Sequence, residues 1–134
     1  MFAGKIGILG GGLLGRMLIQ AGIDFNLRFK VLDPDSNAPC KDIAEFECGK
    51  LTDYKTVLAF ANDCDLITIE IENVNTAALK ELAKAGKKVY PQPEVIELIQ
   101  DKRSQKEFYK AHNIPTADFI LVNNKQEVYL HQDF

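Results

Sequence analysis

The sequence predicts a doubly wound α/β fold, in which helices cover both faces of a parallel sheet. Strand-like apolar segments alternate with segments of helical spacing along the chain, and this alternation is typical of strand–helix–strand units. A glycine-rich segment, residues 10–15, lies between the first strand-like segment and the first helical one. The chain has 134 residues, of which 46% are hydrophobic and 26% charged. That length and composition suit one globular core but not two complete domains.

The first ninety residues contain four strand-like segments with helical segments between them. Short apolar or β-branched runs predict strands at residues 5–9, 28–32, 66–69 and 87–90. An apolar stripe at helical spacing predicts a helix that packs on the sheet, and it consists of Leu14, Leu18, Ala21 and Phe25. Further helices are predicted around residues 54–61 and 79–83. Right-handed crossovers would join the strands into one parallel sheet.

The remainder of the chain follows a proline-rich break at residues 91–93. Residues 94–100 and 101–111 have the pattern of helices, and residues 119–122 form one further strand-like run. Because this last predicted strand has no visible partner, we expect the chain to be a truncated part of a longer protein.

Charge and cysteine content exclude several classes of function. Sixteen Lys and Arg against nineteen Asp and Glu give a net charge of −3, which supplies no broad positive field for a nucleic acid. Three cysteines without a CxxC pair make a poor disulfide framework and a poor zinc site, and this favours a cytoplasmic protein. The apolar run at residues 6–19 contains three consecutive glycines and Arg16, so we expect neither a membrane span nor a signal peptide.

The glycine-rich segment satisfies the pattern GxGxxG between a predicted strand and a predicted helix. Glycines let the backbone turn tightly and approach a phosphate, while the N–H groups and dipole of the helix start attract it. A tight structural turn without any ligand is the alternative. Asp33, at the end of the second strand, could hold the ribose of a dinucleotide such as NAD, or could cap its own turn.

Carboxylates follow the third predicted strand, where ligands bind in open α/β sheets. Glu70 and Glu72 would share one face if the strand continued that far, and could accept hydrogen bonds from an amine or a sugar hydroxyl. Solvated side chains at a strand end, with Asn73 starting a turn, are the alternative. Lys102 belongs to a charged run that by spacing alone predicts a solvated helix face.

Several blocks of the sequence, in this order and spacing, closely resemble the amino-terminal part of the 5-(carboxyamino)imidazole ribonucleotide synthase family, ATP-grasp ligases of purine biosynthesis. The blocks span nearly the whole chain and are residues 10–18, 31–34, 38–40, 64–74, 100–102 and 114–117. The resemblance implies that ATP and bicarbonate carboxylate the amine of aminoimidazole ribonucleotide. It further implies a full-length protein that is cytoplasmic and homodimeric.

By this resemblance, residues 1–93 form a Rossmann-like pre-ATP-grasp domain that does not bind NAD, and residues 94–134 are linker helices and the truncated beginning of the ATP-grasp domain. Substrate-binding positions would be Gly12, Leu13 and Leu14, facing the phosphate, together with Glu72 and Asn73, facing the imidazole or ribose. Lys102 would lie near the ATP. An NAD-binding module of an oxidoreductase remains the alternative.

Two departures from the family limit what this chain can do. The family usually has Gln at the position of Leu13, and an apolar side chain cannot replace its amide hydrogen bonds. The chain also ends before the family's later ATP lysine, its flexible glycine-rich loop and the groups that hold Mg²⁺ between the phosphates. Phosphoryl transfer depends on such groups, so we expect no catalytic residue in this span and no activity from the chain alone.

Overall fold

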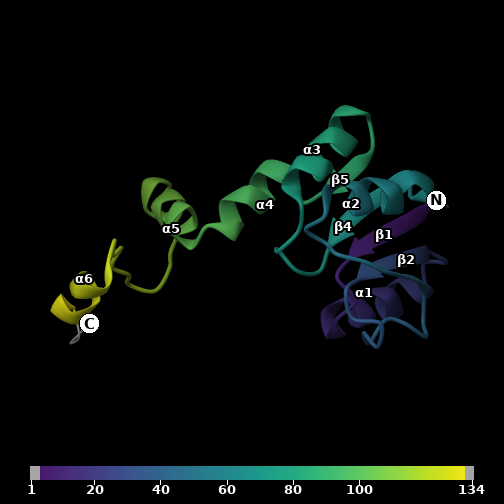
Figure 1. Cartoon of the computed structure of the whole chain (residues 1–134), viewed down its shortest axis with the longest axis horizontal. Helices are drawn as coiled ribbons and strands as arrows, with labels where there is room; N and C mark the ends of the chain where they lie inside the picture. The colour runs from purple at the N-terminus through teal and green to yellow at the C-terminus, as the bar shows by residue number, and fades with distance from the viewer. Residues whose placement is uncertain (1–3, 132–134) are drawn as a thin grey trace. The chain divides into compact units, whose positions relative to one another are not determined.

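The computed structural model describes residues 4–131, and its first compact unit is built on a five-stranded parallel sheet. The strands lie in the order β3-β2-β1-β4-β5, and every neighbouring pair is parallel. Figure 1 labels four of them, β1, β2, β4 and β5. Their bounds are β1 Lys5–Leu9, β2 Arg28–Asp33, β3 Glu45–Cys48, β4 Leu66–Ile69 and β5 Lys88–Tyr90. This topology confirms the doubly wound α/β fold that the sequence predicts.

Helices cover the two faces of the sheet unequally. The larger core includes Leu32 and Ile67 and lies under three helices, α2 (Tyr54–Phe60), α3 (Thr76–Lys84) and α4 (Pro93–Gln100). A smaller core, which includes Ile8 and Val31, lies under α1 (Leu13–Ile23). A single 3-10 turn, η1 (Ala61–Asp63), links α2 to β4. No helix among residues 4–131 is long and apolar enough to cross a membrane.

The packing face of α1 differs from the predicted stripe. Leu14 and Phe25 are 65% and 69% exposed, whereas the buried residues of the helix are Gly15, Ile19 and Gly22. A methyl group on Gly22 would overlap the ring of Phe29 in β2, so the glycines bring α1 close to the sheet. The prediction that the large apolar stripe packs on the sheet is therefore wrong, because close approach selects the small residues for the buried side.

Strand β3 has no counterpart in the sequence prediction. It is four residues long, lies at the sheet edge and reads Glu-Phe-Glu-Cys, so it lacks the apolar run of a buried strand. Its two glutamates form ion pairs with lysines of the neighbouring strands, Glu45 with Lys5 at 2.7 Å and Glu47 with Lys30 at 3.2 Å. Backbone pairing with β2 and the packing of Phe46 on the smaller core hold this strand, with the ion pairs at its border. A single apolar residue between two charged ones is too weak a periodic signal to predict a strand.

Asp63, at the amino-terminal edge of the sheet, also binds these two lysines. Its carboxylate lies 2.7 Å from Lys5 Nζ and 3.0 Å from Lys30 Nζ. Hydrogen bonds from Lys5 and Lys30 lower the pKa of Asp63 to about 2, against an ordinary value of 3.8. Lys30 Nζ additionally lies over the Phe60 ring, 5.0 Å from its centroid. This charge cluster joins β1, β2, β3 and η1.

The second compact unit begins at Asp101 and contains α5 (Lys102–Ala111) and α6 (Lys125–Leu130). The segment between them carries no strand, so the strand predicted at residues 119–122 is wrong within the described residues. A strand needs a partner for its backbone groups, and here Arg103 donates instead to the Val122 carbonyl at 2.6 Å. Lys106 Nζ lies 5.2 Å from the Phe119 ring centroid in the same unit.

The first unit extends beyond the predicted domain boundary at Pro93. Helix α4 belongs to that unit, and Ile96 is fully buried in its larger core. The compact unit therefore ends at Gln100. The division into a pre-ATP-grasp domain at residues 1–93 and a following region stays a prediction.

Candidate functional site

The glycine loop joins β1 to α1 at the carboxyl-terminal edge of the sheet. Gly10 has a φ of +107°, a backbone conformation that L side chains rarely adopt, and its N–H donates to the Leu32 carbonyl at 2.9 Å. Gly12 precedes the first turn of α1, and no side chain caps that turn. The N–H groups of the helix start are therefore open to a ligand of negative charge.

Asp33, at the end of β2, braces the glycine loop. One carboxylate oxygen accepts a hydrogen bond from the Gly11 N–H at 2.6 Å, and the other accepts from the Asp35 N–H at 2.8 Å. Both oxygens of Asp33 are thus bound to backbone within the protein. The alternative that Asp33 caps its own turn is confirmed, and this arrangement disfavours a role in binding the ribose of NAD.

Glu70 follows β4 directly and lies against the same loop. Its backbone N–H donates to the Leu9 carbonyl at 2.7 Å, which aligns the strand end with β1. A methyl group built on Gly12 would lie 2.5 Å from one carboxylate oxygen of Glu70, and one built on Gly10 would lie 2.7 Å from the other. Within residues 4–131, no group donates a hydrogen bond to this carboxylate or forms an ion pair with it. Glu70 is half-buried, and its carboxylate can accept hydrogen bonds from a ligand.

The predicted substrate contacts Glu72 and Asn73 are exposed in the loop after β4, which ends at Ile69. Because the strand stops there, Glu70 and Glu72 do not continue its alternation. The Gln100 side chain, at the end of α4, holds this loop by donating to the carbonyls of Glu72 at 2.7 Å and Val74 at 2.9 Å. Asn73 also lines a small cavity of about 210 Å³ whose walls include Lys50 and Thr52.

Leu13 and Leu14, the other predicted substrate contacts, occupy the first turn of α1. Their side chains are 70% and 65% exposed, so only their backbone N–H groups offer polar contacts at this edge. Gly12, Leu13 and Leu14 thus lie beside Glu70 at one site. Sequence reasoning noticed Glu70 but named Glu72 as the substrate contact, and that contact stays a prediction. The structure adds Glu70 to this site, and its place at the first position after a central strand is the sequence signal for it.

Cys40 lies behind the loop, where its N–H donates to the Gly11 carbonyl at 3.0 Å. Burial raises the pKa of the Cys40 thiol, and the negative charges of Glu70 and Asp33 raise it further. The thiol is therefore protonated at neutral pH and is a poor nucleophile. Among the described residues, no group of three or more His, Cys, Asp or Glu side chains could hold a metal ion.

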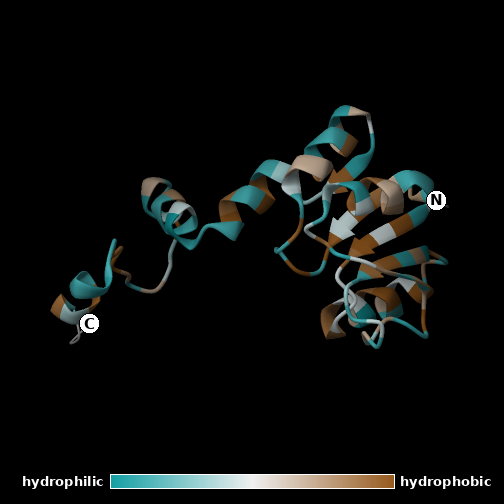
Figure 2. Cartoon of the chain, viewed as in Figure 1, coloured by the Kyte–Doolittle hydropathy of each residue, from teal (hydrophilic) through white to brown (hydrophobic). Residues whose placement is uncertain are grey.

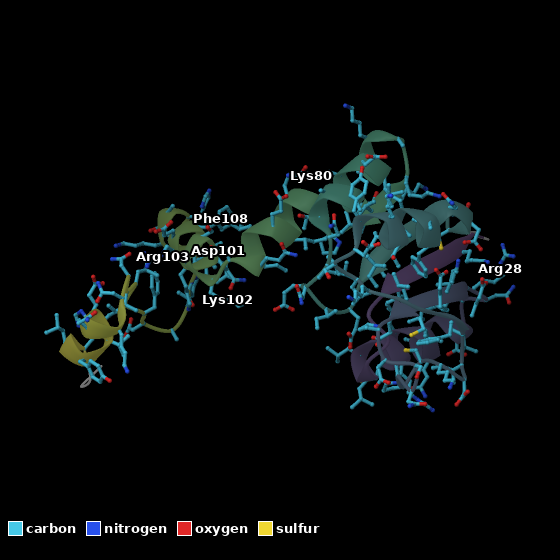
Figure 3. All side chains as sticks on the ribbon, in the orientation of Figure 1. Arg28, Lys80, Asp101, Lys102, Arg103 and Phe108 are labelled. Carbon is cyan, nitrogen blue, oxygen red and sulfur yellow. The ribbon has the colours of Figure 1, made fainter. Side chains whose placement is uncertain are left out.

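Lys102 belongs to the second compact unit, as the first residue of α5 (Figure 3). The preceding Asp101 caps the helix by accepting a hydrogen bond from the Ser104 N–H at 2.8 Å. Lys102 is exposed, and its position suits contact with an anion from solvent. Its predicted contact with ATP stays a prediction.

Residues 3–100 match the family described as the ribonucleotide synthetase pre-ATP-grasp domain. The chain belongs to this family. A phosphoribosylaminoimidazole carboxylase from Ogataea methanolica is 42% identical over 89% of this chain and 23% of its own length. An N5-carboxyaminoimidazole ribonucleotide synthase from Saccharolobus solfataricus is 40% identical over 92% of this chain and 32% of its own length. This chain thus spans a third or less of these relatives, and the family resemblance seen in the sequence is confirmed.

Solved structures of the same family have the same fold. An N5-carboxyaminoimidazole synthase from Aspergillus clavatus, in complex with ADP and 5-aminoimidazole ribonucleotide, is 36% identical with a TM-score of 0.81, over 98% of this chain and 36% of that one. The N5-carboxyaminoimidazole ribonucleotide synthetase from Thermotoga maritima is 32% identical with a TM-score of 0.80, over 95% of this chain and 36% of that one. The relative from Aspergillus clavatus thus holds ADP and the ribonucleotide in one complex.

Proposed function

We propose that this chain forms the ribonucleotide-binding part of an ATP-dependent ligase that carboxylates the amine of 5-aminoimidazole ribonucleotide with bicarbonate. The observation that carries the proposal is the unpaired Glu70 carboxylate beside the glycine loop, at the edge of the sheet where ligands of this fold class bind. The chain's relative from Aspergillus clavatus was solved in complex with that ribonucleotide and ADP, and this supports the choice of ligand.

Glu70 accepts a hydrogen bond from the amine or a ribose hydroxyl of the ribonucleotide. A carboxylate in a half-buried position gains most from a ligand that brings donors, because it lacks full hydration and has no donor within the protein. Glu72 and Asn73 contact the imidazole or ribose from the exposed loop.

The phosphate binds the N–H groups at the start of α1, from Gly12 to Leu14, where the helix dipole favours an anion. Because Glu70 lies against Gly10 and Gly12, the phosphate lies on the Leu13 and Leu14 side of this turn, away from the carboxylate. The ribonucleotide therefore spans the loop with its donors at one end and its phosphate at the other.

ATP and the reaction itself involve the region that follows this chain in its longer relatives. Lys102 contacts ATP, and the region that follows this chain in its longer relatives would supply the groups that hold Mg²⁺. Bicarbonate attacks the γ-phosphate of ATP, releasing ADP and forming carboxyphosphate. Carbon dioxide and phosphate are then released in a closed site, and the amine attacks the carbon dioxide and loses a proton to give the carbamate. The longer protein is cytoplasmic and homodimeric in this proposal, and the chain alone consumes no ATP.

A titration followed by NMR tests the proposed contact at Glu70. We expect the ribonucleotide to shift backbone resonances of residues 10–15 and 70–73, and Glu70→Gln to weaken its binding by about tenfold, as expected for one charge-assisted hydrogen bond. Ribose 5-phosphate lacks the imidazole and its amine, so Glu70→Gln should weaken the binding of ribose 5-phosphate by less than it weakens that of the ribonucleotide. Asp24→Asn changes an exposed carboxylate at the other end of α1 and is the matched control. Unchanged binding by Glu70→Gln, or shifts confined to other residues, would contradict the proposal.

A further inference from the structure

Gln100, the last residue of α4, lies against the loop that follows β4. Ile96 precedes it by one helical turn on the same side of α4 and is fully buried in the larger core. Val74 of the loop belongs to that core as well. The packed side of α4 therefore brings Gln100 to the backbone of residues 72–74. Figure 2 shows both apolar and hydrophilic residues along α4, as expected for a helix with one packed and one exposed side.

The backbone of this loop forms a three-residue turn centred on Asn73. The Val74 N–H donates to the Glu72 carbonyl at 2.8 Å, and this hydrogen bond closes the turn. Gln100 Nε2 binds both ends of the turn, donating to the Glu72 carbonyl at 2.7 Å and to the Val74 carbonyl at 2.9 Å. A side-chain amide carries two N–H donors, so each donor of Gln100 has an acceptor. One side chain thus holds the whole turn.

Other contacts fix only the far end of this loop. Val74 is buried, and the side-chain amide of Asn75 donates to the Thr52 carbonyl at 2.9 Å. Residues 71–73 are exposed, and within the described part of the chain Gln100 is the one side chain that forms a hydrogen bond with their backbone. The conformation at the centre of the turn therefore depends on Gln100.

We infer that Gln100 is a positioning residue for the ribonucleotide, because it holds the turn that presents Asn73. This inference rests on the proposed function, in which Asn73 contacts the imidazole or ribose. An exposed turn without this support samples many backbone conformations, and ordering it when the ligand binds lowers the affinity. Gln100 orders the turn before the ligand arrives. Gln100 does not touch the ligand, so its effect on binding passes through the turn.

The requirement at position 100 is for hydrogen-bond donors and not for size. Glutamate has the shape of glutamine, but its carboxylate would face two carbonyl oxygens without a hydrogen to share. Methionine has a similar length and also lacks a donor, so Gln100→Met removes the hydrogen bonds without adding a charge. Lysine carries three N–H donors on a flexible side chain and can bind both carbonyls. Ribonucleotide binding should therefore survive Gln100→Lys and weaken in the other two variants.

Titration of the 134-residue chain with 5-aminoimidazole ribonucleotide tests the inference. We expect Gln100→Glu and Gln100→Met to weaken binding by about fivefold to tenfold, and Gln100→Lys to stay within about twofold of the wild type. In the ligand-free chain, Gln100→Met should speed amide hydrogen exchange at Val74, whose N–H closes the turn. Gln92→Glu makes the same change in an exposed residue at the other end of α4 and is the matched control.

A double variant shows whether Gln100 acts through the turn. Asn73→Ala should weaken binding, and adding Gln100→Met should then cause little further loss, because the side chain that Gln100 positions is already gone. Additive losses, or no recovery in Gln100→Lys, would overturn the inference.

A purely structural role for Gln100 predicts a different result. Gln100→Met would then lower the free energy of unfolding while the folded protein kept the affinity of the wild type, and this outcome would also overturn the inference. Circular dichroism shows that each variant is folded during the titration. Unchanged binding by Glu70→Gln would instead contradict the proposed function, so the two proposals fail separately. A wild type that binds no ribonucleotide would contradict both.

Discussion

Two carboxylates touch the glycine loop, and the protein satisfies only one of them. Asp33 binds the Gly11 N–H at 2.6 Å and the Asp35 N–H at 2.8 Å, so its charge is fully used in holding the backbone. Glu70 contacts the loop from the neighbouring strand end, and no group in residues 4–131 donates to it. The satisfied carboxylate stabilises the site, and the unsatisfied one is available to a ligand.

This difference separates stability from binding at one loop. Substitution of a carboxylate that accepts hydrogen bonds from the backbone, such as Asp33, should lower the free energy of unfolding, because the backbone donors are left without a partner. Substitution of a group that the fold does not use should leave stability nearly unchanged and affect the ligand alone.

Gly10→Ala should have the largest effect, because two costs coincide at this position. The φ of +107° strains any residue with a Cβ, and that Cβ would lie 2.7 Å from a Glu70 carboxylate oxygen. We expect a loss of about 3 kcal/mol in the free energy of unfolding, measured with urea. Gly86→Ala is the control, since its φ of +89° brings the strain but nothing lies within 4 Å, and it should lose only about 1 kcal/mol. Equal losses would show that Glu70 does not crowd the loop.

Asp33→Ala should lower the free energy of unfolding by about 2 to 3 kcal/mol, because the N–H groups of Gly11 and Asp35 lose a charged acceptor. Asp35→Ala removes one acceptor from the Asn37 N–H in an exposed turn, and should cost about 0.5 to 1 kcal/mol. Urea unfolding of both variants compares the two. A smaller loss for Asp33→Ala than for Asp35→Ala would contradict the bracing role.

Leu13→Gln should restore the amide that the family usually has at this position. One neutral hydrogen bond contributes about 0.5 to 1.5 kcal/mol, so ribonucleotide affinity should rise by up to about tenfold. Calorimetry is best done on the chain fused to the ATP-grasp domain of a relative, where ATP affinity should stay nearly unchanged. Gly12→Val should weaken the ribonucleotide by blocking close approach to the backbone. Equal ribonucleotide affinities of the wild type, Leu13→Gln and Gly12→Val would show that the glycine loop is only a structural turn and binds no ligand.

The Asp63 cluster predicts how stability depends on acidity. The pKa of Asp63 is about 2 in the folded protein and 3.8 ordinarily, so this carboxylate adds stability above pH 4 and loses that contribution as pH falls from about 4 to about 2. Because the group is partly exposed and screened by solvent, Asp63→Asn should cost only about 1 kcal/mol at pH 6. Unfolding at several pH values should show the two proteins converging at low pH. A difference in the free energy of unfolding between the two proteins that stayed constant with pH would contradict the lowered pKa of Asp63.

Glu70→Gln should change the free energy of unfolding least, by no more than about 0.5 kcal/mol, because no donor within residues 4–131 loses a partner. Thermal unfolding of the same variant that is used for ligand titration provides the measurement. A loss as large as that of Asp33→Ala would show that Glu70 supports the fold, and the comparison between the two carboxylates would fail.

Hydrophobic periodicity and glycine spacing were enough to predict the parallel sheet. Strands β1, β2, β4 and β5 are apolar or β-branched runs, and the glycine loop joins β1 to α1 where the pattern placed it. Strand β3 was missed because its one core-packed residue, Phe46, lies between two glutamates, and its pairing with β2 is a tertiary contact. The strand predicted at residues 119–122 failed for a related reason, since an apolar run becomes a strand only when another strand pairs with it.

The sequence by itself determined the fold class, the family and the position of the loop, because these depend on local patterns and on motif order. The tertiary structure decided which side chains meet at the loop. It brought Asp33 and Glu70 to Gly11 and Gly12 from strands on opposite sides of β1. It also turned the glycines of α1 inward and its leucines outward, because the distance between helix and sheet is a property of their contact and is absent from the spacing of either alone.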